Sequence, residues 1–186
     1  MKDINKSLQL WLEEIDKFEL TKYENLPDID LYMDQILTYL ERQLNTFAVS
    51  SLDKQITSSM INNYVKGDCI PSPISKKYNR EHIALILQIC LLKRATNISD
   101  IKQMLDALYQ NADFMGTYND FVEKTALTLH EVSKETQQKL ENIETNNQNE
   151  LLKLALELSI VANTNMIIAN RILKYIEIQN NLKEDK

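Results

Sequence analysis

The stretch from residue 57 to residue 80 constrains the fold most, because it joins a helical pattern to a segment that cannot be helical. At 3.6 residues per turn, its first ten residues place four apolar side chains on one face, namely Met60, Ile61, Tyr64 and Val65. Pro71 and Pro73 then restrict the backbone to extended conformations. We therefore predict a short helix with Thr57 as its N-cap, followed by an extended arm over residues 70–74.

The opposite face of this predicted helix is polar and carries a single positive charge. It consists of Ser58, Ser59, Asn62, Asn63 and Lys66. Amide and hydroxyl groups can form hydrogen bonds with base edges in the major groove of DNA, and Asn matches adenine best. An ordinary solvated helix surface is an equally good interpretation of this pattern.

Gly67 follows the predicted helix, and we expect it to take the positive φ that favours glycine at a helix C-terminus. After the arm, three cations surround an aromatic residue in a short segment that contains Lys76, Lys77, Tyr78 and Arg80. Such a segment suits the binding of phosphate groups. The alternative is a solvated charge cluster at a helix start. Cations there oppose the helix dipole, and a bound anion would offset that penalty.

These residues resemble the DNA-binding domain of MerR-type regulators. They resemble more closely a group of bacterial proteins of unassigned function that share the core Met-Ile-Asn-Asn-Tyr, and the likeness covers residues 28–108 of this chain. It is carried by Met60 to Lys66, Ile70-Pro71, Lys76-Lys77-Tyr78 and Glu81-His82-Ile83. The resemblance implies a recognition helix, a turn, a small wing with a basic and an aromatic residue, and then another helix.

Two residues depart from the MerR pattern. Asn62 stands where those regulators usually carry an arginine, and Asn63 stands where they carry the first tyrosine of a pair. Contact with bases or sugars is therefore a better expectation at these two positions than contact with phosphate. Taken with the residue pattern, the resemblance implies a set of DNA-contacting residues: Thr57, Ser58, Ser59, Asn62, Asn63, Tyr64, Lys66, Lys76, Lys77, Tyr78 and Arg80.

The charge distribution agrees with this location for a DNA-binding surface. The whole chain has a formal net charge of −6, which argues against a simple basic nucleic-acid binder. Residues 51–100, however, hold seven basic and four acidic side chains, a surplus of three positive charges. The one clearly basic part of the chain is therefore the part that resembles a DNA reader.

Apolar residues at helical spacing predict helices on both sides of the 57–80 stretch. Residues 4–18 form one amphipathic pattern. A second pattern, over residues 33–47, would support the recognition helix, with Asp28 or Asp30 as its N-cap. Two glycines and three prolines in 186 residues are very few. The predicted fold class is therefore all-α, with a winged helix-turn-helix of MerR type, an extra N-terminal helix and long C-terminal helices.

Two more helices are expected after the basic cluster. Asn79 can cap a helix that runs to residue 94 and is apolar on nearly every side, as a central core helix would be. Ser99 can cap a further helix, which completes the expected DNA-binding domain at residues 1–110. Residues 111–186 would then form a helical dimerisation region.

This second region has a polar part, residues 119–149, and a densely apolar part, residues 151–178. Charged and amide side chains interrupt the apolar part, so we predict no membrane span. We expect a homodimer interface made of Leu129, Leu140, Ile143, Leu154, Leu158, Val161, Ile168, Ile172 and Tyr175. The alternative is that both parts fold back on residues 4–18 and complete a monomeric bundle.

The sequence contains no glycine-rich phosphate loop, no Ser-His-Asp pattern and no closely spaced histidine pair, so we predict no enzyme and no catalytic residues. Cys69, His82 and Cys90 are better explained as core residues than as a metal site, and no cofactor is expected. The acidic N-terminus does not resemble a secretory signal, which favours a cytoplasmic location. The leading hypothesis is a homodimeric transcriptional regulator that binds double-stranded DNA, with or without a small-molecule effector. The alternative is a protein-interaction module on the same scaffold that does not bind DNA.

Overall fold

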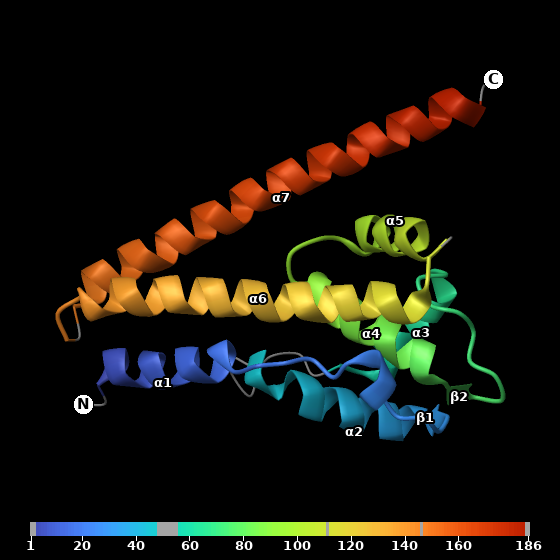
Figure 1. The fold of residues 1–186 in the computed structure, drawn as a ribbon, viewed down its shortest axis with the longest axis horizontal. Helices are drawn as coiled ribbons and strands as arrows, with labels where there is room; N and C mark the ends of the chain where they lie inside the picture. The colour runs from blue at the N-terminus through green and yellow to red at the C-terminus, as the bar shows by residue number, and fades with distance from the viewer. Residues whose placement is uncertain (1–2, 48–55, 111, 146, 185–186) are drawn as a thin grey trace.

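The computed structural model describes residues 3–47, 56–110, 112–145 and 147–184, most of which are helical (Figure 1). The α-helices are α1 (Ile4–Asp16), α2 (Met33–Leu44), α3 (Ser58–Lys66), α4 (Arg80–Leu92), α5 (Ile98–Tyr109), α6 (Phe114–Glu141) and α7 (Gln148–Glu184). Two short 3-10 helices are η1 (Tyr23–Asn25) and η2 (Asn45–Phe47). Strands β1 (Leu31–Tyr32) and β2 (Lys77–Tyr78) pair antiparallel. The predicted, predominantly helical class is confirmed.

Helix α4 lies at the centre of the core. Every residue from His82 to Cys90 is buried, and Ile83, Ile86 and Ile89 have no exposed surface. The core around it takes side chains from α2, α3, α5, strands β1 and β2 and the start of α6. The prediction of a central core helix after Asn79 is confirmed.

The helix caps agree with the sequence where the capping signal is local. The Thr57 hydroxyl accepts a hydrogen bond from the N–H of Met60, and the Asn79 side chain accepts one from the N–H of His82. Two predicted caps are wrong. Strand β1 intervenes before α2, whose N-cap is Tyr32 rather than Asp28 or Asp30. Helix α5 begins two residues earlier than Ser99 implies, and its cap is Asn97.

The expected positive φ falls one residue after Gly67. Gly67 has φ −88°, whereas Asp68 has φ 53°. The N–H of Cys69 donates to the carbonyl of Tyr64 at 2.8 Å, and the N–H of Asp68 donates to Val65 at 3.1 Å. These are the two hydrogen bonds of a Schellman motif. In that motif the residue with positive φ is the one that follows the C-cap, here Asp68 after Gly67.

Helix α6 lies along α1, so part of the predicted dimer surface is used within the chain (Figure 1). The carboxylate of Asp16 on α1 lies 2.6 Å from Nδ1 of His130 and 3.6 Å from Nζ of Lys134. Leu140 is 1% exposed, whereas Leu129 and Ile143 are partly buried. Leu140 therefore packs within the chain, and the expectation that it faces a second copy is wrong. For Leu129 and Ile143 the expectation stays a prediction.

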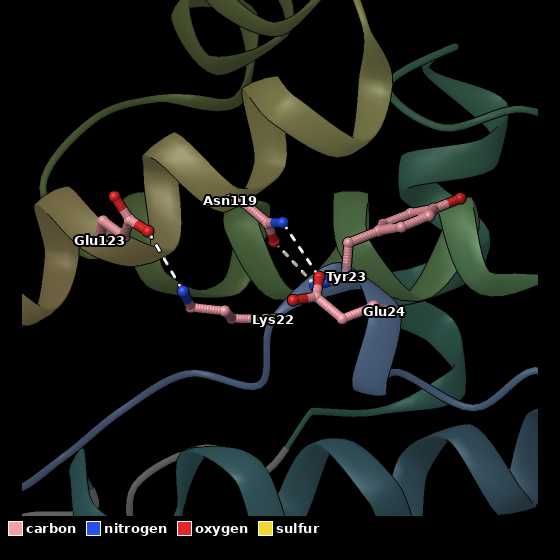
Figure 2. A network of polar contacts seen from close by, with 5 residues as sticks. All are labelled: Lys22, Tyr23, Glu24, Asn119 and Glu123. Atoms are coloured by element: carbon pink, nitrogen blue, oxygen red, sulfur yellow. Dashed lines mark hydrogen bonds and ion pairs between the residues drawn. The ribbon is translucent and has the colours of Figure 1, made fainter.

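A polar network attaches the segment after α1 to α6 (Figure 2). The side chain of Asn119 accepts a hydrogen bond from the N–H of Tyr23 at 2.9 Å and donates to Glu24 at 3.0 Å. Nζ of Lys22 lies 3.2 Å from the carboxylate of Glu123. Helix α6 thus packs against elements from before residue 110, and the division of the chain there stays a prediction.

Helix α7 is the most exposed element. Near its start, Leu154 is buried and Glu157 forms an ion pair with Lys139 of α6 at 2.6 Å. Beyond this point, α7 diverges from α6 (Figure 1). Residues Gln148–Leu182 are long and apolar enough to cross a membrane, judged by length and composition alone. Of the two C-terminal helices, then, only α6 folds back on α1.

Candidate nucleic-acid interface

Helix α3 presents the predicted polar face to solvent. Ser58, Ser59, Asn62, Asn63 and Lys66 are all exposed, and so is the N-cap Thr57. On the inner face, Ile61 is fully buried and Tyr64 is 5% exposed. Burial raises the pKa of Tyr64 to about 12. We therefore remove Tyr64 from the expected DNA contacts and assign it to the core.

The predicted wing region contains a tight turn, Ile74 to Lys77, that leads into β2, and β2 pairs with the distant strand β1. This turn and the two strands together are called the hairpin below. Leu31 pairs with Tyr78, Tyr32 pairs with Lys77, and the N–H of Lys77 donates to the carbonyl of Ile74 at 2.9 Å. Between Ile74 and Lys77, Ser75 has φ 51° and Lys76 has φ 63°. Positive φ at both positions is typical of the two-residue turns whose twist matches that of the flanking strands. Exposed Lys76 therefore lies at the tip of this turn.

The basic cluster divides into two parts. Nζ of Lys77 lies 5.2 Å from the centre of the Tyr32 ring, on the hairpin. The guanidinium of Arg80 instead lies 5.6 Å from the Tyr23 ring, and its Nε donates to the carbonyl of Pro27 at 3.5 Å. Arg80 is thus engaged with the segment before β1. Tyr78 is 3% exposed and belongs to the core, so it too is removed from the expected contacts.

Three residues of this surface were missed by the sequence interpretation. Tyr32 is 53% exposed beneath Lys77, and Ile74 is 77% exposed beside the tip of the turn. Nζ of Lys102 donates to the carbonyl of Asp68 at 2.6 Å, which places a cation at the end of α3. Tyr32 and Lys102 lie at the site because distant parts of the chain contact each other. No local sequence pattern predicts their position there.

Acidic residues border the same surface. Asp28, Asp30 and Asp34 flank β1 and are exposed, and Asp68 follows α3. At an ionic strength of about 0.15 M, charges interact over roughly 8 Å, so these carboxylates weaken the positive potential of the hairpin. The interface therefore combines a polar helix face with a small basic tip and offers no broad basic surface.

His82 lies in the first turn of α4 and connects it to the N-cap Asn79 and to Tyr78 of β2. Its Nδ1 accepts a hydrogen bond from the N–H of Asn79 at 3.2 Å, and its ring packs edge-on against Tyr78. Burial lowers the pKa of His82, and this is partly offset by the backbone of Ser72 and Pro71 in the arm. The neutral ring is therefore the form that the fold stabilises.

This histidine predicts a dependence of stability on pH. Its folded pKa lies below the unfolded value of about 6.5, so its stabilising contribution is present above pH 6.5 and is lost as the pH falls through the folded pKa. A His82→Gln variant keeps a side chain able to complete the capping box but does not titrate. We expect thermal unfolding between pH 7 and pH 5 to depend less on pH in this variant than in the natural chain. An equal dependence would contradict the assignment.

The two cysteines do not form a reactive site. Burial raises the pKa of the Cys69 thiol and raises the pKa of Cys90 to about 11, so both are neutral thiols at pH 7. A cavity of about 890 Å³ lies between residues 68–72, α5 and the C-terminal half of α7. Its mainly apolar lining could hold a small molecule, but an effector stays a prediction.

A comparison with protein families found one match. A family model described as "Domain of unknown function (DUF1836)" matches residues 21–121. No curated protein and no solved structure matches the chain. The matched part runs from η1 to the first turns of α6 and contains α3 and the hairpin. The candidate interface thus lies within the matched region, whereas α1 and α7 lie outside it.

Proposed function

The chain belongs to the family of the domain of unknown function DUF1836, and from its site we propose that it is a cytoplasmic, non-enzymatic regulator of transcription that binds double-stranded DNA as a homodimer. In this proposal α2, α3 and the paired strands β1 and β2 with the turn before β2 act as a winged helix-turn-helix of MerR type. Helix α3 enters the major groove, and the hairpin contacts the backbone.

The observation that supports the proposal most is the exposed face of α3. Its inner side anchors the helix through Ile61, while Asn62 and Asn63 are free to approach base edges. The basic turn with Lys76 and Lys77 follows the extended arm after α3, in the order helix, turn, wing and helix that the resemblance implies.

A second candidate is a protein-interaction module on the same scaffold. The net charge of −6 and the carboxylates beside β1 favour it, and so does the engagement of Arg80 with Tyr23. Such a module would use the same exposed surface but would have no affinity for phosphate groups. Salt dependence therefore separates the two functions.

The test is a salt titration of binding to duplex DNA of random sequence. For a DNA-binding protein, the logarithm of affinity should fall with the logarithm of salt concentration, with a slope of about −0.9 for each phosphate contacted. Lys77→Ala should weaken binding to all sequences alike and make the slope shallower by about one contact. Lys124→Ala, on the exposed face of α6, is the matched control and should change nothing. No measurable binding at low salt by a folded protein would favour the interaction module.

A base-reading residue should behave differently from a phosphate-binding one. Asn63→Ala is expected to change the preference among DNA sequences, at a cost of roughly 1–3 kcal/mol at one base pair. Its effect on the salt slope should be small because no charge is removed. Selection from a random DNA library, compared for the two variants, measures this. If Asn63→Ala and Lys77→Ala weaken every sequence equally, the proposed division of roles is wrong.

A further inference from the structure

Much of the apolar surface of α7 lies open to solvent after the helix leaves α6. The exposed fractions of Val161, Ile168, Ile172, Tyr175 and Leu182 are 52%, 54%, 54%, 56% and 62%. Isolated exposed apolar residues are ordinary, but a continuous row of this length marks a surface that binds something.

These residues follow a heptad spacing. Beginning at Leu158, steps of three and four residues alternate through Leu158, Val161, Asn165, Ile168, Ile172, Tyr175, Gln179 and Leu182. The row spans more than three heptads, which is the length at which such a pattern indicates a coiled coil. In heptad terms, Leu158, Asn165 and Ile172 occupy a positions, whereas Val161, Ile168 and Tyr175 occupy d positions.

The position of Asn165 discriminates between orientations of a helix pair. In a parallel, in-register pair, an a residue meets the same a residue of the other helix, so two amide side chains can hydrogen-bond to each other. In an antiparallel pair, a residues pack beside d residues. The d residues Val161, Ile168 and Leu182 offer no polar group, so Asn165 would lack a partner in an antiparallel pair unless the register set it against the hydroxyl of Tyr175.

We propose that α7 pairs with α7 of a second copy of this chain as a parallel, in-register coiled coil with Asn165 facing its counterpart. The row from Leu158 to Leu182 forms the interface. The d residue that precedes this row, Leu154, is buried within the chain, close to the ion pair between Glu157 and Lys139 of α6. The proposed interface therefore begins where α7 leaves α6. The alanines at the neighbouring positions 155, 162 and 169 allow close approach of the two helices.

A membrane is the less favourable partner for the same helix. Asn163 and Asn165 lie near the middle of Gln148–Leu182, and Arg171 and Lys174 follow within three turns. Amide groups at that depth are costly because the hydrocarbon core offers no hydrogen-bond partner. In the parallel pair, Arg171 and Lys174 lie outside the a/d row and remain in water.

The proposal has a consequence for DNA binding, which rests on the proposed function. Helix α3 and the hairpin lie toward the end of the molecule to which the C-terminus of α7 points (Figure 1). A parallel pair therefore places both copies of α3 and the hairpin at the same end of the coiled coil. An antiparallel pair would separate them along the 37-residue helix, about 55 Å long at 1.5 Å per residue.

The first experiment uses two adjacent isoleucines of the full chain. Ile168 is in the proposed row and 54% exposed, whereas Ile167 is at a c position and 61% exposed. Sedimentation equilibrium without DNA should show a dimer for the natural chain and for Ile167→Glu, and a dissociation constant at least 100-fold weaker for Ile168→Glu. A monomeric natural chain at tens of micromolar, or equal effects of the two substitutions, would overturn the proposal.

The second experiment tests orientation. In the full chain carrying Leu182→Cys, a parallel pair brings the two new thiols together, so mild oxidation should link most of the protein into covalent dimers. An antiparallel pair places these thiols at opposite ends, out of reach of a disulfide. The natural chain is the control, because Cys69 and Cys90 are buried. A dimer that does not cross-link would overturn the parallel arrangement.

The third measurement separates a second copy from a membrane. The natural chain is mixed with phosphatidylcholine vesicles, with and without phosphatidylglycerol, and pelleted. The dimer should remain in the supernatant with both compositions. A chain that is monomeric in solution and is carried down with the vesicles would overturn the proposal in favour of a lipid surface. None of these experiments contains DNA, so failure of the proposed DNA binding would leave their outcome unchanged.

Discussion

A Tyr78→Ala variant is expected to lose about 3–5 kcal/mol of the free energy of unfolding, the usual cost of removing a buried aromatic ring. Tyr78 is 3% exposed, pairs with Leu31 across the hairpin and packs edge-on against His82. Its removal would leave a cavity under the hairpin. Chemical denaturation followed by circular dichroism measures the loss.

Two matched variants distinguish packing from DNA contact at this place. Tyr78→Phe keeps the ring and should lose much less stability, whereas a DNA-contacting hydroxyl would make it defective in binding. Lys77→Ala removes the adjacent side chain on the other face of the strand and should leave stability nearly unchanged. If Tyr78→Phe is fully stable yet binds DNA more weakly by 1 kcal/mol or more, Tyr78 has a contact role that its burial does not explain.

The sequence predicted elements whose signals are local. Thr57 and Asn79 are caps because a short polar side chain stands directly before a helical pattern. The two faces of α3 follow from a 3.6-residue period, and the burial of Ile61 and exposure of Asn62 and Asn63 agree with it. Helix α4 is central because it has almost no polar side.

Features that depend on distant contacts were not predictable in the same way. Strand β1 has only two residues, and it forms because residues 77–78 pair with it across 45 positions of sequence. That pairing buries Tyr78, exposes Tyr32 and displaces the start of α2 from Asp30. The interpretation of Tyr78 as a surface aromatic failed because strand alternation, which decides the side a residue faces, needs a known partner strand.

The roles of the two C-terminal helices show the same limit. Both carry apolar rows, and periodicity alone cannot say which row packs within the chain. Helix α6 has the complementary partner α1, whose Asp16 meets His130 and Lys134. Asp16 and His130 are 114 positions apart in the sequence. A helical period does not encode a contact at that separation, so it could not show that α6 packs against α1.

A Leu140→Ala variant is expected to lose about 2–5 kcal/mol of the free energy of unfolding. Leu140 is 1% exposed near the end of α6, close to the place where the side-chain amide of Asn5 donates to the carbonyl of Ile143 at 3.1 Å. Truncation there removes buried packing at the end of α6 and leaves a cavity next to this hydrogen bond. Leu127→Ala, on the same helix at 61% exposure, is the matched control and should cost less than about 0.5 kcal/mol.

The concentration dependence of this loss decides between the two roles of Leu140. If Leu140 packs within the monomer, its loss lowers the unfolding free energy by the same amount at every protein concentration, and the folded variant dimerises with unchanged affinity. If Leu140 instead lay in the dimer interface, the variant would dissociate more readily, and its deficit would change with concentration by mass action. Denaturation at 1 and 100 μM, with sedimentation under native conditions, distinguishes these results. A deficit present only where the natural chain is dimeric would restore Leu140 to the interface and remove α6 from the monomer core.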